Sequence, residues 1–254
     1  MKKTITFIGN GSMALSIAKG LKEHYHIEVV GRNREKLQQF ETTLQTQCSI
    51  ALLDGFDITN KNIILCIKPA NTQEVGTKLT GKANALYSVL AGTSLTTLKQ
   101  NFQAHAYVRA MPNLAASVGA SMTTLTGDIV QKDIAIQLFS AIGATRWLGS
   151  EKEIDIATAL AGSGPAYLAL IAEALADGAV QQGLKRDDAM AIMRGLFSGF
   201  AQLNETTHPA LLKDGVMSPG GTTAAGYATL EKNGVRSACI EAIANAYKKA
   251  QELA

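Results

Sequence analysis

The fold of this chain is decided by the stretch Thr4-Ile5-Thr6-Phe7-Ile8-Gly9-Asn10-Gly11-Ser12-Met13-Ala14. Residues 4–8 are a β-branched and aromatic run, which predicts a short buried strand. The glycines and the alanine that follow have the G-x-G-x-x-A form of a dinucleotide fingerprint. In this form Gly9 allows the tight turn, Gly11 lets the backbone approach a pyrophosphate, and Ala14 lets the next helix pack close to the strand.

The residues after the fingerprint complete a β-α-β unit. A helix is predicted to about residue 23, and the apolar residues 27–30 predict a second strand. A glycine turn can also be merely structural. Because the strand, the helix and the second strand are all in place, we favour a dinucleotide site at this turn.

The end of the second predicted strand indicates which dinucleotide is bound. Binding sites for NAD usually place an acidic residue there, on the ribose hydroxyls. This chain instead has Gly31-Arg32-Asn33-Arg34, and the guanidinium groups of Arg32 and Arg34 suit a phosphate by charge and geometry. The sequence therefore favours NADPH over NADH. The alternative is that Arg32 and Arg34 are solvated charges in a loop and bind no phosphate.

Strands and helices alternate up to about residue 150, which is typical of a mostly parallel, doubly wound sheet of the Rossmann type. From Glu151 onward no strand pattern remains, and small apolar residues recur at helical spacing. We predict two domains: an NADP(H)-binding α/β domain over residues 1–150 and an all-α domain over residues 151–254. The predicted strands are 4–8, 27–30, 47–51, 62–67, 85–90, 105–109, 118–124 and 144–148.

The predicted all-α domain has several faces of small apolar side chains and only about 100 residues. A few helices of this kind would leave a large apolar patch exposed, so we expect them to pack against a second copy of the chain as a homodimer. The predicted helices are 154–182, 187–204, 208–214, 221–232 and 235–252.

Composition limits the remaining classes of function. The formal net charge of +3 comes with no basic cluster, so nucleic acid is not an expected partner. No run of about 18 uninterrupted apolar residues occurs, and we expect a soluble, cytoplasmic protein with no membrane span. The 3 cysteines are far apart and the 4 histidines form no ligand pair, so no disulfide and no metal site are expected.

Three further loops follow predicted strands, where ligands of parallel sheets bind. They are Ile67-Lys68-Pro69, Leu90-Ala91-Gly92 and Arg109-Ala110-Met111-Pro112-Asn113. Lys68 is either catalytic or, as we favour, a lysine that reaches solvent or a phosphate. Asn113 either bonds the nicotinamide side of the site or caps the segment that follows.

A second polar loop lies near the C-terminus, in the run Ser218-Pro219-Gly220-Gly221-Thr222-Thr223. Pro219 and the glycines predict a tight loop that opens a helix, where free N–H groups, hydroxyls and the helix dipole converge. This combination suits a small anion such as a carboxylate, and an ordinary helix cap is the alternative. Further upstream, Pro165 predicts either a kinked helix or a helix junction.

The whole chain resembles the pyrroline-5-carboxylate reductases. The resemblance rests on residues 7–14, 109–113, the stretch Gly162-Ser163-Gly164-Pro165-Ala166-Tyr167, and residues 218–223, of which the last is the most specific. It implies an N-terminal Rossmann domain, a C-terminal helical dimerisation domain and NADPH as reductant, with NADH possible and weaker. It also implies a pocket for 1-pyrroline-5-carboxylate that the partner subunit completes, and in many members assembly beyond the dimer.

The resemblance also assigns roles to individual residues. The substrate carboxylate would bind the loop residues, and Thr223 would hydrogen-bond the ring nitrogen as the catalytic residue. The loop residues are Ser218, Gly220, Gly221 and Thr222. The cofactor would bind at Gly9, Gly11, Ser12 and Met13 by its pyrophosphate, at Arg32, Asn33 and Arg34 by its 2′-phosphate, and at Ile67, Lys68, Pro69, Ala91, Gly92 and Asn113 toward the nicotinamide.

Two other classes of function stay open at this point. A β-hydroxyacid dehydrogenase also joins a Rossmann domain to a helical one, but it uses a lysine in the body of a helix. The predicted helix that follows residue 151 has Lys152 only at its start. A regulatory protein that only binds NADPH would need no second polar pocket, so the loop at residues 218–223 counts against it.

Overall fold

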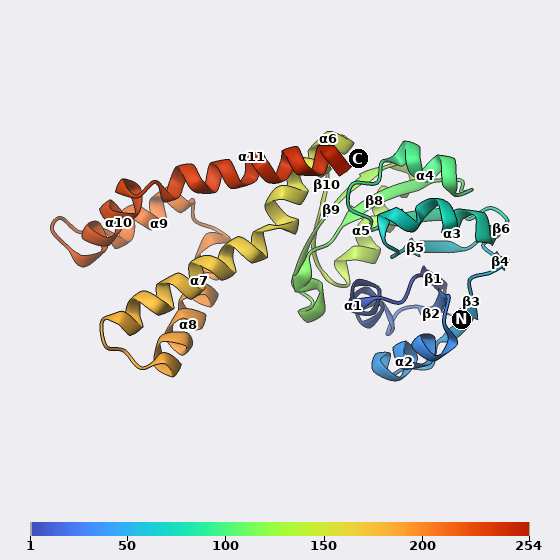
Figure 1. The fold of residues 1–254 in the computed structure, drawn as a ribbon, viewed down its shortest axis with the longest axis horizontal. Coiled ribbons are helices and arrows are strands. Elements are labelled where there is room, and N and C mark those ends of the chain that lie inside the picture. Colours follow the sequence, from blue (N-terminus) through green and yellow to red (C-terminus); the bar gives the residue numbers. More distant parts are fainter. Residues whose placement is uncertain (1, 254) are drawn as a thin grey trace. The chain divides into compact units, whose positions relative to one another are not determined.

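The computed structural model describes residues 2–253 and divides the chain into two compact units. One unit is Met1–Pro165 together with Asn245–Ala254, and the other is Ala166–Ala244. Figure 1 shows strands and helices mixed in the first unit and helices alone in the second.

The first unit is built on one sheet with the strand order β10-β9-β8-β7-β5-β1-β2-β3. All neighbouring strands are parallel except β8 and β9. A short connection that holds only a 3₁₀ helix, Leu114–Val118, joins those two, and it is too short for the crossover that a parallel pair requires. The strands are β1 (Thr4–Ile8), β2 (His26–Gly31), β3 (Ser49–Leu52), β5 (Asn62–Leu65), β7 (Ala85–Ser88), β8 (Tyr107–Met111), β9 (Ser121–Gly127) and β10 (Gly143–Trp147).

Helices cover both faces of this sheet, so the predicted doubly wound α/β fold is confirmed (Figure 1). On one face Phe7 of β1 packs in a core with residues of α1, α2 and α5, while Ile8 faces a second core with residues of α3 and α4. Such alternation along one strand is what a strand buried on both sides shows. The helices are α1 (Ser12–Leu21), α2 (Arg34–Leu44), α3 (Thr72–Lys78), α4 (Leu95–Asn101), α5 (Lys132–Ser140) and α6 (Glu151–Ala157).

Three differences from the predicted elements go beyond a shift of a residue or two at a strand end. The predicted strand 118–124 begins only at Ser121, because the 3₁₀ helix runs to Val118 and Gly119 ends it in a left-handed conformation. Two short strands that were not predicted, β4 (Phe56–Asp57) and β6 (Leu79–Thr80), pair with each other outside the main sheet. The predicted helix 154–182 begins at Glu151 and contains a π-helical segment, Thr158–Gly162.

The helical part of the chain leaves most of its apolar side chains uncovered. Its helices are α7 (Gly164–Gln181), α8 (Arg186–Asn204), α9 (Pro209–Val216), α10 (Thr222–Lys232) and α11 (Val235–Leu253). Within Ala166–Ala244 only two apolar residues, Ala176 and Ala189, are buried, whereas Leu170 and Ile192 are more than 60% exposed. The helical stretch Glu151–Gln181 has the length and composition of a membrane span, with 11% of its apolar window buried. A helix that packs on a second chain has the same properties.

Candidate functional site

The turn between β1 and α1 has the geometry that the fingerprint predicts. Gly9 has φ +108°, and its N–H donates to the Val30 carbonyl oxygen at 2.8 Å. A Cβ on Gly9 would lie 2.3 Å from the carbonyl oxygen of Cys66, so no other residue fits without a shift of the backbone. Gly11 opens α1 with no side-chain cap, and nothing lies within 4 Å of its Cβ direction. The first N–H groups of α1 therefore face space that an anion can occupy.

The turn opens into a cleft of about 210 Å³ between the carboxyl ends of β1, β2 and β5. β1 has β2 on one side and β5 on the other, so the strand order reverses here, where open α/β sheets bind ligands. The cleft brings together five predicted residues: Gly9, Gly11, Arg32, Ile67 and Lys68. Asn10, Gly31, Cys66 and Asn71 also line it, although the sequence analysis assigned them no binding role.

The loop after β2 contains two exposed arginines and, between them, an asparagine that caps the next helix. Arg32 is exposed on the cleft and lies 3.6 Å from a carboxylate oxygen of Glu74. Asn33 caps α2, because its side-chain oxygen accepts the N–H of Lys36 at 3.0 Å. Arg34 is the first residue of α2 and is exposed. Asn33 thus holds the helix start at which the two guanidinium groups are displayed.

A second cavity, of about 390 Å³, lies beside the N-termini of α1 and α2. Ser12 and Lys36 line it from the two helices, and Gly11 is shared with the first cleft. Lys36 is a basic residue that sequence reasoning missed, although its place in the first turn of the helix after Arg32 could have indicated it. Together these residues place positive charge and free N–H groups at adjoining cavities, an arrangement that suits phosphate groups.

The loop after β5 contains an exposed lysine beside a cysteine thiol. Lys68 is exposed in extended backbone ahead of a 3₁₀ helix that Pro69 begins. Burial strongly raises the pKa of the neighbouring Cys66 thiol, which therefore stays protonated at neutral pH. This wall of the cleft can position a cofactor but supplies no thiolate.

The loop after β7 joins that strand to α4 over residues 89–94. Ala91 is exposed and Gly92 is half-buried, while the next residue, Thr93, is buried. Ser94 then caps α4 by accepting the N–H of Thr97 at 3.1 Å. The loop thus exposes its backbone between two fixed ends, the strand and the capped helix.

Asn113 uses both ends of its side chain inside the protein. Its side-chain oxygen accepts the N–H of Ala115 at 3.1 Å, which caps the 3₁₀ helix, and its amide nitrogen donates to the Ala161 carbonyl oxygen at 3.0 Å. In an unbroken α-helix that carbonyl would accept from the residue four positions on, but Pro165 has no N–H. Asn113 therefore supplies the hydrogen bond that Pro165 cannot. Capping is observed, and contact with nicotinamide stays a prediction.

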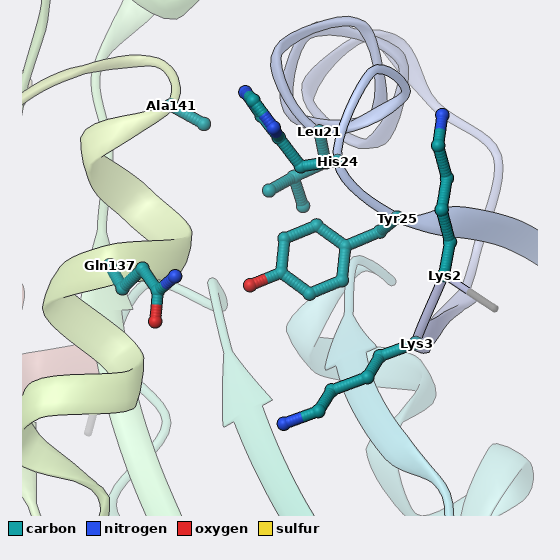
Figure 2. Close-up of a pocket in the computed structure, with 7 residues that line it drawn as sticks. All are labelled: Lys2, Lys3, Leu21, His24, Tyr25, Gln137 and Ala141. Atoms are coloured by element: carbon teal, nitrogen blue, oxygen red, sulfur yellow. The ribbon is translucent and has the colours of Figure 1, made fainter.

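A larger cavity, of about 500 Å³, lies elsewhere, at the amino ends of β1 and β2 (Figure 2). In Figure 2 Tyr25 points across it toward Gln137 of α5, with Lys3 and His24 on either side. The cavity adjoins the C-terminal end of α1, where carbonyl groups are free and the helix dipole is negative. Lys2 accordingly donates to the Lys22 carbonyl oxygen at 3.2 Å. The basic side chains complement that helix end, and the cavity is not the predicted cofactor site.

The loop before α10 is a β-turn of defined type. The N–H of Gly221 donates to the Ser218 carbonyl oxygen at 3.0 Å, Pro219 occupies the second position, and Gly220 occupies the third with φ +73°. These are the features of a type II turn. A Cβ on Gly221 would lie 2.5 Å from the Ser218 hydroxyl oxygen, so that hydroxyl lies directly over the start of α10.

The start of α10 is open. Gly221 is its N-cap residue, no side chain caps the helix, and no acidic residue lies in its first turn. Thr222 and Thr223 are exposed there. The structure thus places the hydroxyl of Ser218, two threonines and free N–H groups at one helix end, which suits a carboxylate.

The fold, the phosphate-binding turn and the cleft define a nicotinamide-dinucleotide-dependent oxidoreductase. Residues 4–92 match the family described as NADP oxidoreductase, coenzyme F420-dependent. Residues 151–253 match the family described as pyrroline-5-carboxylate reductase dimerisation.

Comparison of the whole chain identifies the family. The chain is 40% identical over 269 residues to the pyrroline-5-carboxylate reductase of Synechocystis sp., covering 100% of this chain and 99% of that protein. A solved pyrroline-5-carboxylate reductase from Coxiella burnetii is similar with a TM-score of 0.85 and 31% identity, covering 100% of this chain and 99% of that one. The Streptococcus pyogenes enzyme follows at 0.84 and 31%, with 98% of each chain covered. This chain belongs to the pyrroline-5-carboxylate reductase family, as the sequence motifs predicted.

The two glycines of the turn separate folding from cofactor binding. Gly9→Ala places a side chain on a carbonyl at positive φ, so we expect a loss of at least about 1–3 kcal/mol in stability together with weaker NADPH binding. Gly11→Ala has room in the protein. We expect it to keep the melting temperature and to weaken NADPH binding about tenfold or more, because the methyl group occupies the place of the pyrophosphate. Thermal unfolding and quenching of NADPH fluorescence measure the two effects. Unchanged NADPH affinity in Gly11→Ala would place the pyrophosphate elsewhere.

Proposed function

We propose that this protein reduces the C=N bond of 1-pyrroline-5-carboxylate with NADPH to give L-proline, the last step of proline biosynthesis. The observation that carries the proposal is the uncapped start of α10 after the Ser218–Gly221 turn. A cyclic imine with one carboxylate needs an anion receptacle and a hydride donor. The chain has this receptacle in its helical part and a dinucleotide cleft in its sheet, and it belongs to the family that carries out the reaction.

The substrate carboxylate would be held by backbone N–H groups at the start of α10. The residues proposed to bind it are Ser218, Gly220, Gly221 and Thr222, and Thr223 is proposed to contact the ring nitrogen. Because this anion site is built from backbone, the charge is fixed in place without a flexible cationic side chain. The substrate ring would then have one orientation relative to the helix axis.

The cofactor would lie along the cleft between β1, β2 and β5. We propose that Gly9, Gly11, Ser12 and Met13 hold the pyrophosphate, and that Arg32 and Arg34 meet the 2′-phosphate at the helix start that Asn33 caps. Toward the nicotinamide we propose Ile67, Lys68, Pro69, Ala91, Gly92 and Asn113. When bound, NADPH supplies the hydride that adds to the imine carbon.

The reaction needs little acid–base chemistry from the protein. A protonated imine is already an electrophile, and hydride addition to its carbon leaves the proton on the nitrogen of the amine product. We propose that Thr223 orients that nitrogen by a hydrogen bond, since this residue is exposed in the first turn of α10. Orientation and capture of the carboxylate can therefore account for much of the rate enhancement.

We further propose that residues 1–150 form the cofactor domain and that residues 151–254 form the domain through which two copies associate. The exposed apolar side chains of α7 and α8 support the homodimer, because a second chain would bury them. We also propose that such dimers build a larger assembly. We expect the protein to act in the cytoplasm, with no nucleic-acid or membrane partner.

The direct test is oxidation of NADPH with racemic 1-pyrroline-5-carboxylate, followed at 340 nm, with L-proline identified as the product. We expect saturable turnover of one enantiomer, and slower turnover with NADH. A small 2- or 3-hydroxyacid with NADP⁺ is the control for the dehydrogenase class. Folded protein that binds NADPH without turnover of either substrate would support a regulatory function and overturn the proposal.

Removal of the arginine charges tests the preference for NADPH. Arg32→Ala and Arg34→Ala should each weaken NADPH binding about tenfold or more, because each loses a charge-assisted hydrogen bond to the 2′-phosphate, and should leave NADH binding nearly unchanged. Glu74→Gln is the matched control, since it removes the carboxylate that pairs with Arg32 and Lys78 and keeps both guanidinium groups. An equal loss for NADH and NADPH would show that the arginines do not read the 2′-phosphate.

Thr223→Val removes the hydroxyl and keeps the branched shape. We expect kcat to fall about 10- to 100-fold, the equivalent of one lost hydrogen bond, at nearly normal NADPH affinity. Thr223→Ser should recover most of the rate. Thr229→Val, in the same helix with its hydroxyl bonded to the Ala225 carbonyl, controls for helix stability. An unchanged rate in Thr223→Val would remove Thr223 from the reaction.

A further inference from the structure

Arg109 is a buried cation in the middle of the sheet. It lies on β8, which has β7 on one side and β9 on the other, and its side chain is 2% exposed. A guanidinium group keeps its charge in proteins, so burial requires nearby carboxylates. Glu151 and Asp155 provide them, accepting from Nη1 at 3.0 Å and from Nη2 at 2.7 Å. The two carboxylates are four residues apart on α6 and therefore share one face of that helix.

Glu151 makes a further bond that connects a second loop. The same Oε1 atom accepts the backbone N–H of Leu95 at 2.8 Å. Leu95 is the first residue of α4, directly after the loop that contains Ala91 and Gly92. One carboxylate oxygen thus joins β8 to the end of the loop that follows β7.

The loop after β8 is fixed to the same structure at a second point. α6 leads into the π-helical segment, whose Ala161 carbonyl oxygen accepts from the side chain of Asn113. Asn113 follows Arg109 by four residues, so this loop is bonded at its strand end and at its tip. π-Helical turns of this kind occur often at functional sites. The two cofactor loops and the segment Glu151–Gly162 are therefore held as one hydrogen-bonded set.

We propose that Glu151 is a positioning residue of the reductase. Through Arg109 and Leu95 it fixes the backbone at Ala91 and Gly92 relative to Asn113, and so fixes the surface on which the nicotinamide would rest. This inference depends on the proposed function for its catalytic consequence. Glu151 touches neither substrate nor cofactor in this scheme, and its effect is on geometry, to which hydride transfer is sensitive because a displacement of about 1 Å can cost about 100-fold in rate.

Two substitutions at Glu151 and one at its neighbour test the proposal. Glu151→Ala should lower kcat with 1-pyrroline-5-carboxylate about 10- to 100-fold while changing the NADPH dissociation constant less than about threefold, since the phosphate contacts lie elsewhere. Glu151→Gln should recover most of the rate, because its amide oxygen still accepts from Leu95 and Arg109. Glu153→Ala is the matched control: it lies in the same helical turn and accepts from Gly149 at 2.9 Å. Equal kcat in Glu151→Ala and Glu153→Ala would overturn the proposal.

Hydrogen exchange distinguishes a positioning role of Glu151 from a general loss of folding. It also distinguishes failure of this inference from failure of the proposed function. With NADPH bound, we expect faster amide exchange at residues 91–97 in Glu151→Ala than in Glu153→Ala. This readout does not need turnover, so it tests the connection even if the wild type does not reduce 1-pyrroline-5-carboxylate. If Glu151→Ala does not fold, Asp155→Asn weakens the Arg109 pair and keeps the Leu95 bond. Exchange at residues 91–97 should then match the wild type, and faster exchange there would contradict the assigned path.

Discussion

The close approach of Gly9 to the Cys66 carbonyl is the constraint on which the nucleotide-binding unit depends. It brings the carboxyl ends of β1 and β5 together and directs the first turn of α1 across the point where the strand order reverses. The cores on both faces of β1 hold this geometry, with Phe7 in one and Ile8 in the other. The direction of the free N–H groups at the start of α1 is therefore a consequence of strand packing, because the turn sets it.

Buried polar bonds connect parts of the chain that are distant in sequence. Asn113 and Ala161 are 48 residues apart, and Arg109 and Glu151 are 42 apart. Each bond satisfies a polar group that lacks a partner in its own segment. Asn113 donates to the Ala161 carbonyl, for which Pro165 has no N–H, and Glu151 pairs with the Arg109 cation that the sheet buries. In both cases the partner comes from the other part of the structure, so the sheet and the Glu151–Gly162 segment stabilise each other. These bonds also connect the loop after β8 to the Glu151–Gly162 segment.

The helical part of the chain follows a different principle. The start of α9 is capped and a type II turn precedes α10, so the ends of these helices are locally defined. The helices nevertheless bury few apolar side chains. Local propensity and turn chemistry are enough to define such helices, whereas a core needs a surface to pack against. The match of residues 151–253 to a dimerisation family agrees with this property. The open start of α10 belongs to the same part of the chain.

The sequence by itself determined the fold class, the turn at Gly9, the Pro219–Gly220 turn and the family, because each depends on local backbone rules and spacing that a single chain displays. It did not determine what Arg109 and Asn113 bond to, where Lys36 lies, or that the helix after Ser150 contains a π-helical segment. Those features depend on which distant segments meet. Only the tertiary structure decides this. A buried charge or an unpaired carbonyl bonds to the element that the packing of the sheet brings within hydrogen-bonding distance, and that element can be distant in sequence.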